Sequence, residues 1–376
     1  MNKKVVSIGF VLLLFIISLI NILQPQRTFS ENESRRLQKL PVVSMDNIFS
    51  GRYTTQFEKY TSDQFVGRDG WTGIKTLAEL TMLKKDNGRV YFGKNGTLFD
   101  ATETVDEKQL INNAGFVREY IKSVRKELPE VNESVMLVPT ASEIYSDLLP
   151  AFAPIPDQQA AINKVKAVFG DDVALYDPTN LLNSSKGEYL YYRTDHHWTT
   201  HAAYIVYTDW AQKNGIKPLT QADFDIIQLS DLFYGTLHSK ANLYTIKPDS
   251  VMAYSFTDAV PVSANYGSNN VSNSLYFKEY LETKDKYSYF LGENRPLIEI
   301  TTATKNGKTL MFIQDSYAHC FIPFLTSHYE NILVLDPRHL DTDYKSYAVK
   351  NKVTDILVLY NLPNFSVEKT LKRLVM

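Results

Sequence analysis

Leu310-Met311-Phe312-Ile313-Gln314-Asp315-Ser316-Tyr317 is the stretch from which the architecture of this chain can be inferred. Its first four side chains are apolar without alternation, which is typical of a strand buried on both faces of a sheet. Similar short apolar runs, separated by segments compatible with helices, occupy 135–138, 173–176, 332–335 and 356–360. The pattern predicts an α/β fold in which a parallel sheet is flanked by helices.

The remaining chain is interpreted around this sheet. Helical patterns occupy 53–64, 71–83, 107–128 and 157–169. A hairpin is expected where 90–92 and 97–99 flank Asn95-Gly96, because this dipeptide favours a tight turn. The pattern weakens between about 224 and 300, where we expect an inserted irregular or β region on one side of the core and not a separate domain.

The amino terminus carries a membrane signal. Val5 to Leu23 is a run of nineteen residues without a charge, preceded by Lys3 and Lys4. Such a helix is roughly 28 Å long, about the thickness of the hydrocarbon core, so the run predicts a single transmembrane signal anchor. A cleaved signal peptide is the alternative, but residues 21–26 contain no small-x-small cleavage pattern.

The lysines before the run predict an orientation for the whole chain. They favour a cytoplasmic tail over residues 1–4 and export of everything after the anchor. The polar segment 24–50, with Pro25 and Pro41, is interpreted as a tether. Residues 51–376 are therefore expected to form an extracytoplasmic domain held at the cell membrane.

Composition excludes several functions. The 376 residues have a formal net charge of −2, so no strong field would attract nucleic acid. The single cysteine, Cys320, excludes an intrachain disulfide and any multi-cysteine metal centre. The 24 tyrosines and 20 phenylalanines are compatible with stacking on sugars, although most such rings serve as core residues. No cofactor is predicted.

The first motif that can carry chemistry is Thr194-Asp195-His196-His197-Trp198-Thr199-Thr200-His201. It lies between a strand-like segment, 189–192, and a helix expected to begin near Thr199 or Thr200. Asp195 and His197 project to the same side of an extended segment, where a carboxylate can orient an imidazole that acts as a base. Two alternatives remain open: Asp195 caps the helix while the histidines pack, or Asp195, His197 and His201 bind a metal ion.

The second motif places a serine where nucleophiles are found. Ser316 stands between the carboxyl end of a core strand and a helical pattern that runs through Phe321, Phe324 and Leu325. Open α/β sheets bind ligands at this edge, and the amide groups of the following turn can stabilise an oxyanion. A serine here is also a good N-cap. Together with the Asp-x-His pair, however, Ser316 completes the parts of a serine nucleophile system.

The two motifs resemble the DHHW family of SGNH-hydrolase-like proteins, which is similar to the alginate O-acetyltransferases AlgX and AlgJ. The likeness rests on 192–199 and 315–319, with weaker matches at 30–35, 63–69, 138–140 and 335–338. As in the alginate enzymes, Asp-x-His precedes the serine, so the order resembles a circular permutation of ordinary SGNH hydrolases. Gln314 stands where those enzymes have a glycine.

By this resemblance Ser316 is the nucleophile, His197 the general base and Asp195 its orienting partner. Four further residues are candidates for oxyanion or substrate binding: Tyr317, Asn361, Arg338 and His238. The activity implied is O-acetyl transfer to a cell-surface polysaccharide, or acetylesterase activity, by a ping-pong mechanism. The implied partners are the polysaccharide acceptor and a membrane-bound O-acyltransferase that supplies the acetyl group.

Two other functions remain open at this point. One is a metal-dependent hydrolase that uses Asp195, His197 and His201. The other is a non-catalytic polysaccharide-binding protein of the cell envelope, since a fold does not determine a function.

Overall fold

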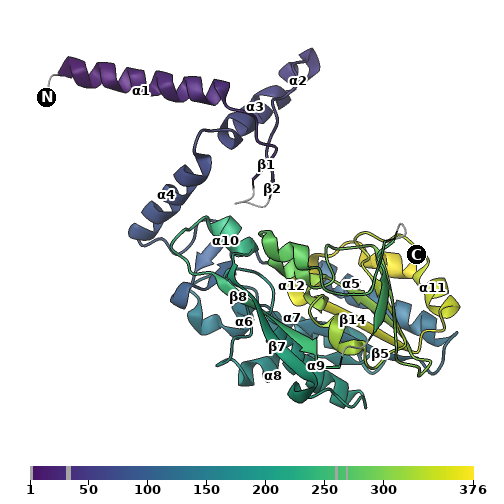
Figure 1. Cartoon of the computed structure of the whole chain (residues 1–376). Helices are drawn as coiled ribbons and strands as arrows, with labels where there is room; N and C mark the ends of the chain where they lie inside the picture. Colours follow the sequence, from purple (N-terminus) through teal and green to yellow (C-terminus); the bar gives the residue numbers. More distant parts are fainter. Residues whose placement is uncertain (1–2, 31–34, 259–260, 268–269) are drawn as a thin grey trace. The chain divides into compact units, whose positions relative to one another are not determined.

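The computed structural model describes residues 3–30, 35–258, 261–267 and 270–376, and the chain divides into two compact units (Figure 1). One unit, called the N-terminal unit below, consists of Met1–Asn87 together with His238–Ile246. The other, the sheet unit, consists of Gly88–Leu237 and Lys247–Met376. Residues 1 and 2 of the expected cytoplasmic tail and residues 31–34 of the first weak motif lie outside the described residues.

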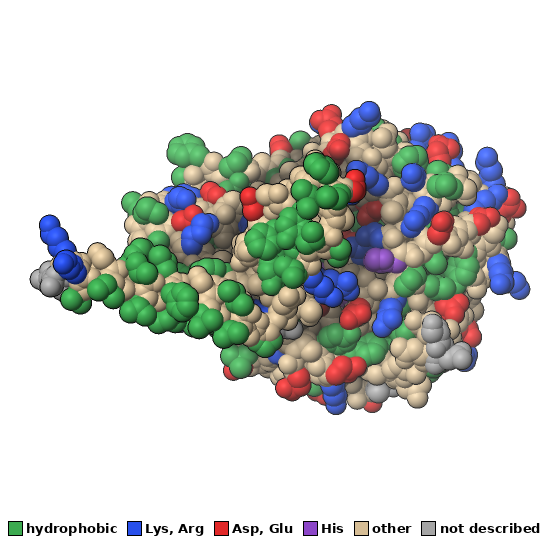
Figure 2. Space-filling model, turned by 90° about the horizontal axis from the view of Figure 1, so that it is seen from above, with side chains coloured by type: hydrophobic (Ala, Val, Ile, Leu, Met, Phe, Trp, Pro, Cys, Tyr) green, Lys and Arg blue, Asp and Glu red, His purple; other side chains and the backbone are tan. Residues whose placement is uncertain are grey.

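The N-terminal unit begins with the predicted apolar helix, α1 (Lys3–Leu23). Among the described residues, α1 is the one helix with the length and composition to cross a membrane, as a single-pass anchor or a signal sequence. Figure 2 shows hydrophobic side chains along α1 and basic side chains at its free end. The elements that follow are β1 (Phe29–Ser30), β2 (Arg35–Arg36), α2 (Met45–Phe49), α3 (Arg52–Asp63) and α4 (Arg68–Thr81).

The weak motif at 63–69 has a structural role in this unit. Arg35 Nη2 and Nη1 donate to Asp63 Oδ1 and Oδ2 over 2.6 and 3.0 Å, and the amide of Gln38 donates to the same carboxylate. The Gln64 side chain donates to the carbonyls of Arg27 and Gln38. These bonds attach the segment after α1 to the turn between α3 and α4.

The sheet unit is built on a mixed sheet that, within the described residues, has eight strands in the order β10-β9-β11-β13-β12-β14-β5-β6. The run from β13 to β6 is parallel, as predicted. Its strands are β13 (Asn331–Leu335), β12 (Thr309–Gln314), β14 (Asp355–Asn361), β5 (Asn132–Val138) and β6 (Leu175–Tyr176).

Alternate side chains of β12 enter two different cores, which explains the unbroken apolar run. Leu310 and Phe312 pack on one face of the sheet with α9 (Thr200–Lys213), while Met311 and Ile313 pack on the other. The elements on that second face are α5 (Glu107–Arg125), α7 (Gln158–Phe169), α11 (Tyr344–Lys350), α12 (Leu362–Val367) and η8 (Leu371–Val375). The parallel strands are therefore buried on both sides.

The region between 224 and 300 contributes more order than its sequence indicates. A two-stranded antiparallel sheet pairs β7 (Phe224–Phe233) with β8 (Asp249–Phe256), and α10 (Thr236–Ala241) lies between them in the chain. The strands β9 (Val262–Asn265), β10 (Val271–Ser272) and β11 (Leu297–Thr302) extend the central sheet in antiparallel pairing. The central sheet is therefore mostly parallel, as predicted, and becomes antiparallel where strands of the inserted region join it.

Smaller elements complete the sheet unit. The predicted hairpin is confirmed: β3 (Val90–Phe92) pairs with β4 (Leu98–Asp100), and Asn95 and Gly96 adopt positive φ between them. Other short elements of the sheet unit are α6 (Ala141–Ile144), α8 (Thr179–Ser184), η5 (Lys286–Tyr289), η6 (Ser316–Ala318) and η7 (Ile322–Leu325). Four other short 3-10 turns are η1 (Lys94–Gly96), η2 (Ser146–Leu148), η3 (Gln221–Asp223) and η4 (Lys278–Glu282).

Candidate active site

Ser316 follows the carboxyl end of β12, as the sequence predicts. Asp315 caps the next turn, with its Oδ1 accepting from the Tyr317 amide over 3.0 Å. The expected helix is instead two 3-10 turns, η6 and η7. A continuous α-helix is disfavoured because Pro323 has no amide hydrogen to donate to the residue four positions before it. Ser316 is partly exposed, whereas its neighbours on both sides are buried.

The loop that carries Asp195 and His197 is closed by its own backbone. The amide of Thr199 donates to the Leu190 carbonyl and that of Tyr192 to the His197 carbonyl. The strand expected over 189–192 is reduced to one isolated bridge, between Tyr191 and Trp198, because the segment folds back on itself. Thr199, not Asp195, caps α9, so the helix-capping alternative for Asp195 was wrong.

These two segments meet in a continuous chain of hydrogen bonds. His197 Nε2 lies 2.9 Å from Ser316 Oγ, and His197 Nδ1 lies 2.5 Å from Asp195 Oδ1. Asp195 and His197 are only 2% and 6% exposed. His197 and Ser316 are 119 positions apart in the sequence, yet they are in hydrogen-bond contact. The three residues thus have the contacts that a serine nucleophile, a base and an orienting carboxylate require.

Asp195 is held as a carboxylate from several sides. Its Oδ2 accepts from the amide and hydroxyl of Thr236, over 2.7 and 3.0 Å. Burial works to raise the pKa of Asp195, but the nearby imidazoles of His196 and His197 and the hydrogen bonds outweigh it and hold this pKa well below its usual range. Gly235 packs so closely that a Cβ there would lie 2.6 Å from Asp195 Cγ. The carboxylate therefore stays charged and fixed.

Tyr287, in η5, contacts both the base and the nucleophile. Its ring stacks on that of His197 with centroids 3.8 Å apart and an interplanar angle of 11°. Its hydroxyl donates to the Ser316 carbonyl over 3.1 Å. Sequence reasoning missed this residue, because one tyrosine in an aromatic-rich insertion carries no distinguishing pattern.

Asp315 links the turn of the serine to the neighbouring strand. Its Oδ2 accepts from the amide and side chain of Asn361, over 3.1 and 2.9 Å, and from Asn364 Nδ2 over 2.9 Å. Burial is the main cause that raises the pKa of Asp315. Asn361, predicted for the oxyanion hole, thus binds Asp315 and caps α12 through the Asn364 amide.

The other candidates occupy different positions around this core. Tyr317 is fully buried: its hydroxyl donates to the His196 carbonyl and its own carbonyl accepts from Trp198 Nε1. Arg338, whose side chain is 27% exposed, donates through Nε and Nη2 to the buried carboxylate of Asp336. His238 belongs to the N-terminal unit, and its expected place beside the cleft stays a prediction.

A second imidazole lies close to the base. His319 is 4% exposed, and burial, reinforced by the nearby His197 and Arg338, lowers the pKa of His319 to about 3. It is therefore neutral at physiological pH. Cys320 is buried, and burial raises the pKa of its thiol to about 12, so it is not a second nucleophile at neutral pH.

The metal hypothesis meets a different arrangement of histidines. Within the described residues, Asp195, His196 and His197 are the one group of three metal-capable side chains. His201 is not a member: its ring nitrogens contact Tyr254 and Glu188. Both nitrogens of His197 are engaged by Asp195 and Ser316. The donor set therefore suits proton transfer better than metal binding.

Fold and site together define an α/β protein with a serine–histidine–aspartate hydrogen-bond chain at the carboxyl edge of its parallel strands. The family model for DHHW protein matches residues 123–335, more than half of the chain. The chain therefore belongs to the DHHW family, and the predicted resemblance is confirmed. A search of curated proteins yields no match to the sequence.

Two solved structures share the fold over most of this chain. A DHHW family protein from Eubacterium siraeum is 22% identical, with a TM-score of 0.63 over 76% of this chain and 97% of its own. PatB1 from Bacillus cereus, solved with a sulfonyl adduct, is 17% identical, with a TM-score of 0.63 over 75% and 99%. The O-acetyltransferase domain of Pseudomonas putida AlgJ is 12% identical over 74% and 92%, with a TM-score of only 0.47.

Proposed function

We propose that this chain is an SGNH-type O-acetyltransferase of the cell surface, in which Ser316 carries the acetyl group between donor and acceptor. The observation that supports it most directly is the unbroken contact from Asp195 through His197 to Ser316 Oγ. A hydroxyl becomes a nucleophile when an adjacent base takes its proton, and the base needs a partner that fixes its tautomer.

The reaction proceeds in two half-reactions. His197 Nε2 takes the hydroxyl proton as Ser316 Oγ attacks the carbonyl carbon of a donor acetyl ester. The bond to the donor oxygen breaks, and the imidazolium returns the proton to that leaving group. An acceptor hydroxyl then gives its proton to His197 and attacks the acetyl-serine, and Ser316 leaves with the proton restored. Water in place of the acceptor gives esterase activity.

The turn at Ser316 also supplies a donor for the tetrahedral intermediate. None of the described residues accepts a hydrogen bond from the Ser316 amide, whereas the Tyr317 amide is bound by Asp315. The free amide stands at the start of η6, close to the attacking oxygen. We therefore assign the first oxyanion contact to Ser316 N–H, and not to Tyr317 or Asn361.

The acceptor is proposed to be an extracellular or cell-wall polysaccharide. The family resemblance favours this acceptor, and export behind α1 would place the site on the same side of the membrane. Because acetyl-CoA is cytoplasmic, a membrane-bound O-acyltransferase is the proposed acetyl donor. Because sugar hydroxyls and water differ little in reactivity, we expect transfer and hydrolysis to share this one site.

The test uses the full chain purified in detergent with 4-nitrophenyl acetate as donor. Ser316→Ala is expected to lower acetate release by at least about 10³-fold, as loss of a nucleophile does elsewhere. Ser184→Ala, an exposed serine in α8, serves as the control and keeps full activity. A sulfonyl fluoride should modify Ser316 alone. Undiminished turnover by Ser316→Ala would end the serine mechanism.

Three further measurements separate the proposal from its rivals. Acetylated oligosaccharide, detected by mass spectrometry after incubation with donor, distinguishes transfer from hydrolysis. Turnover that chelators abolish would favour the metal-dependent hydrolase. Glycan binding that survives combined changes at Asp195, His197 and Ser316, without turnover of any ester, would favour a non-catalytic binding protein.

A further inference from the structure

The two sides of α4 differ in what they contact. On the inner side, Thr76 Oγ1 donates to the Ala241 carbonyl over 3.1 Å, and Gly73 lies directly against the Tyr244 ring. The other side carries large apolar side chains that remain about half exposed among the residues that the structure describes. We call it the outer face of α4 and define it by Trp71, Ile74 and Leu77, which are 55%, 60% and 48% exposed.

The start of α4 is tied to the end of α1. Asn21 Oδ1 accepts from the Val66 amide over 2.7 Å, and Gln24 Nε2 donates to the Gln64 carbonyl. Their two partners, the Val66 amide and the Gln64 carbonyl, lie in the turn between α3 and α4. Asn21 belongs to the last turn of the apolar helix and Gln24 follows it directly. Where α1 leaves a membrane, the turn before α4 must therefore lie within a few ångströms of the surface.

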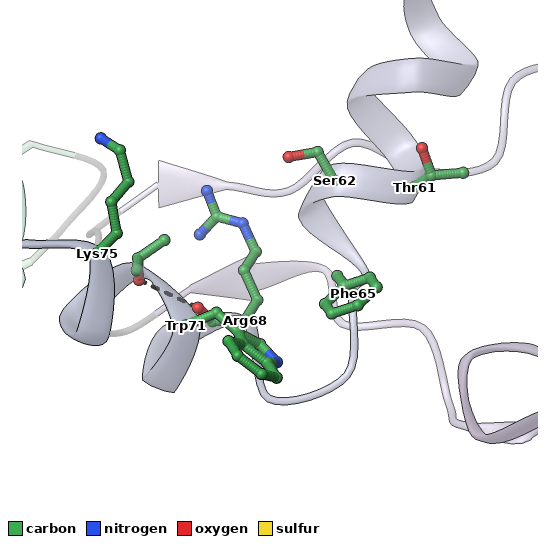
Figure 3. A pocket seen from close by; sticks show the side chains of 7 residues that line it. Thr61, Ser62, Phe65, Arg68, Trp71 and Lys75 are labelled. Atoms are coloured by element: carbon green, nitrogen blue, oxygen red, sulfur yellow. Dashed lines mark hydrogen bonds between the residues drawn. The ribbon is translucent and has the colours of Figure 1, made fainter. Parts of the chain in front are cut away.

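A pocket of about 610 Å³ opens beside the outer face. Figure 3 shows the charged ends of Arg68 and Lys75 with the hydroxyl of Ser62 on one side of the pocket, and the rings of Phe65 and Trp71 on the other. Aromatic rings combined with long cationic side chains are typical of residues at the level of lipid headgroups, where one end is apolar and the other hydrated.

We propose that the outer face of α4 and this pocket rest on the outer surface of the lipid bilayer, next to the point where α1 leaves it. The proposal depends on α1 being retained as a membrane span and is independent of the acetyl transfer. Lipid is the occupant that the position indicates, because the hydrogen bonds to Asn21 and Gln24 bring this face to the end of the span. An apolar face of this kind binds bilayers mainly through apolar burial. Its two cations already have partners, Arg68 with Asp63 at 3.9 Å and Lys75 with Glu79 at 3.3 Å, so attraction to anionic headgroups adds a smaller share, chiefly through Lys75, whose side chain is 66% exposed.

The experiment uses Trp71 as its own probe. The chain has three tryptophans, and the other two, Trp198 and Trp210, are 0% and 3% exposed in the sheet unit. The full chain is reconstituted in nanodiscs of phosphatidylcholine and phosphatidylglycerol, with or without lipids brominated on their acyl chains. Brominated lipid is expected to quench the part of the tryptophan fluorescence that comes from Trp71, which is the part that the Trp71→Phe variant lacks. Aqueous acrylamide should quench this part less in nanodiscs than in detergent.

Two matched variants test whether the face itself is responsible. Ile74→Asp, on the outer face, should abolish quenching by brominated lipid, whereas Ile226→Asp, at a comparably exposed position of β7, should leave it unchanged. Flotation of the chain with vesicles reports on α1 separately, and failure to float overturns the proposal together with its premise. If the chain floats but acrylamide quenches Trp71 in nanodiscs as strongly as in detergent, the proposal is overturned. It is also overturned if Trp71 is protected from acrylamide but is not quenched by brominated lipid, because protein would then cover the outer face of α4.

Discussion

Gly235→Ala tests whether the position of Asp195 controls the chemistry. An added Cβ would lie 2.6 Å from Asp195 Cγ and closer still to Oδ2, where ordinary contacts begin at 3.4 Å. The carboxylate must therefore move by the order of 1 Å. The hydrogen bond from His197 Nδ1, now 2.5 Å, would then exceed the roughly 3.2 Å limit of a good hydrogen bond.

The expected loss of activity follows from that displacement. A misplacement of about 1 Å costs about 10²-fold in rate, and complete loss of the orienting carboxylate about 10⁴-fold. We expect kcat for 4-nitrophenyl acetate to fall between these limits. Overpacking should also lower the free energy of unfolding by about 1–3 kcal/mol. Steady-state kinetics and thermal unfolding of the same preparation measure the two effects separately.

The control is Gly187→Ala, because a Cβ at Gly187 meets nothing within 4 Å. It should leave both kcat and stability close to those of the unchanged chain. If Gly235→Ala keeps kcat within about twofold while Asp195→Asn loses about 10⁴-fold, the packing argument is refuted although the role of Asp195 stands. If both variants keep full activity, the orienting role of Asp195 fails as well.

Two further predictions concern Tyr287 at the site and the buried Glu103, whose carboxylate accepts from Thr140 and Ser142. Tyr287→Phe keeps the ring on His197 but removes the hydrogen bond to the Ser316 carbonyl, so kcat should fall by about 2- to 10-fold, the value of one ordinary hydrogen bond; an unchanged kcat would show that the ring alone matters. Burial raises the pKa of Glu103 from 4.5 to about 7 in the folded chain, so its ionisation opposes folding as pH rises from 4.5 to 7. The full cost is about 3 kcal/mol above pH 7 and vanishes below pH 4.5, and Glu103→Gln should flatten that part of the stability profile in chemical unfolding; an unaltered slope would contradict it.

The parallel core could be predicted because each of its strands is buried on both faces. Leu310 to Ile313 and Ile356 to Tyr360 are unbroken apolar runs for that reason. The antiparallel end of the sheet could not be predicted from the sequence, because β11 mixes buried Ile298 and Ile300 with polar residues and because β10 is only two residues long. The pairing of such strands depends on distant partners that the local sequence does not specify.

The site was predictable to the extent that chemistry follows from position. A serine after a core strand and an Asp-x-His pair on a loop both indicate function by their places in the chain. Asn361 was expected at the oxyanion from the family resemblance and its place at the end of a strand, whereas its hydrogen bond to the buried carboxylate of Asp315 depends on a neighbouring strand that the local sequence does not reveal. Gly235 and Tyr287 act through three-dimensional packing, and no local pattern separates them from the other 15 glycines and 23 tyrosines.

The closed loop around Asp195 and His197 determines how the catalytic chain can deform. The base and its carboxylate share one clamped segment, so they shift together as a single body. Ser316 is fixed to the sheet edge through Asp315. Within the part of the chain that the structure describes, three hydrogen bonds join these two bodies: the 2.9 Å contact of imidazole and hydroxyl, the bond from the Tyr317 hydroxyl to the His196 carbonyl, and the bond from Trp198 Nε1 to the Tyr317 carbonyl. A substrate that displaces the loop outward would therefore have to break both bonds of Tyr317 as well as the contact between the base and the nucleophile.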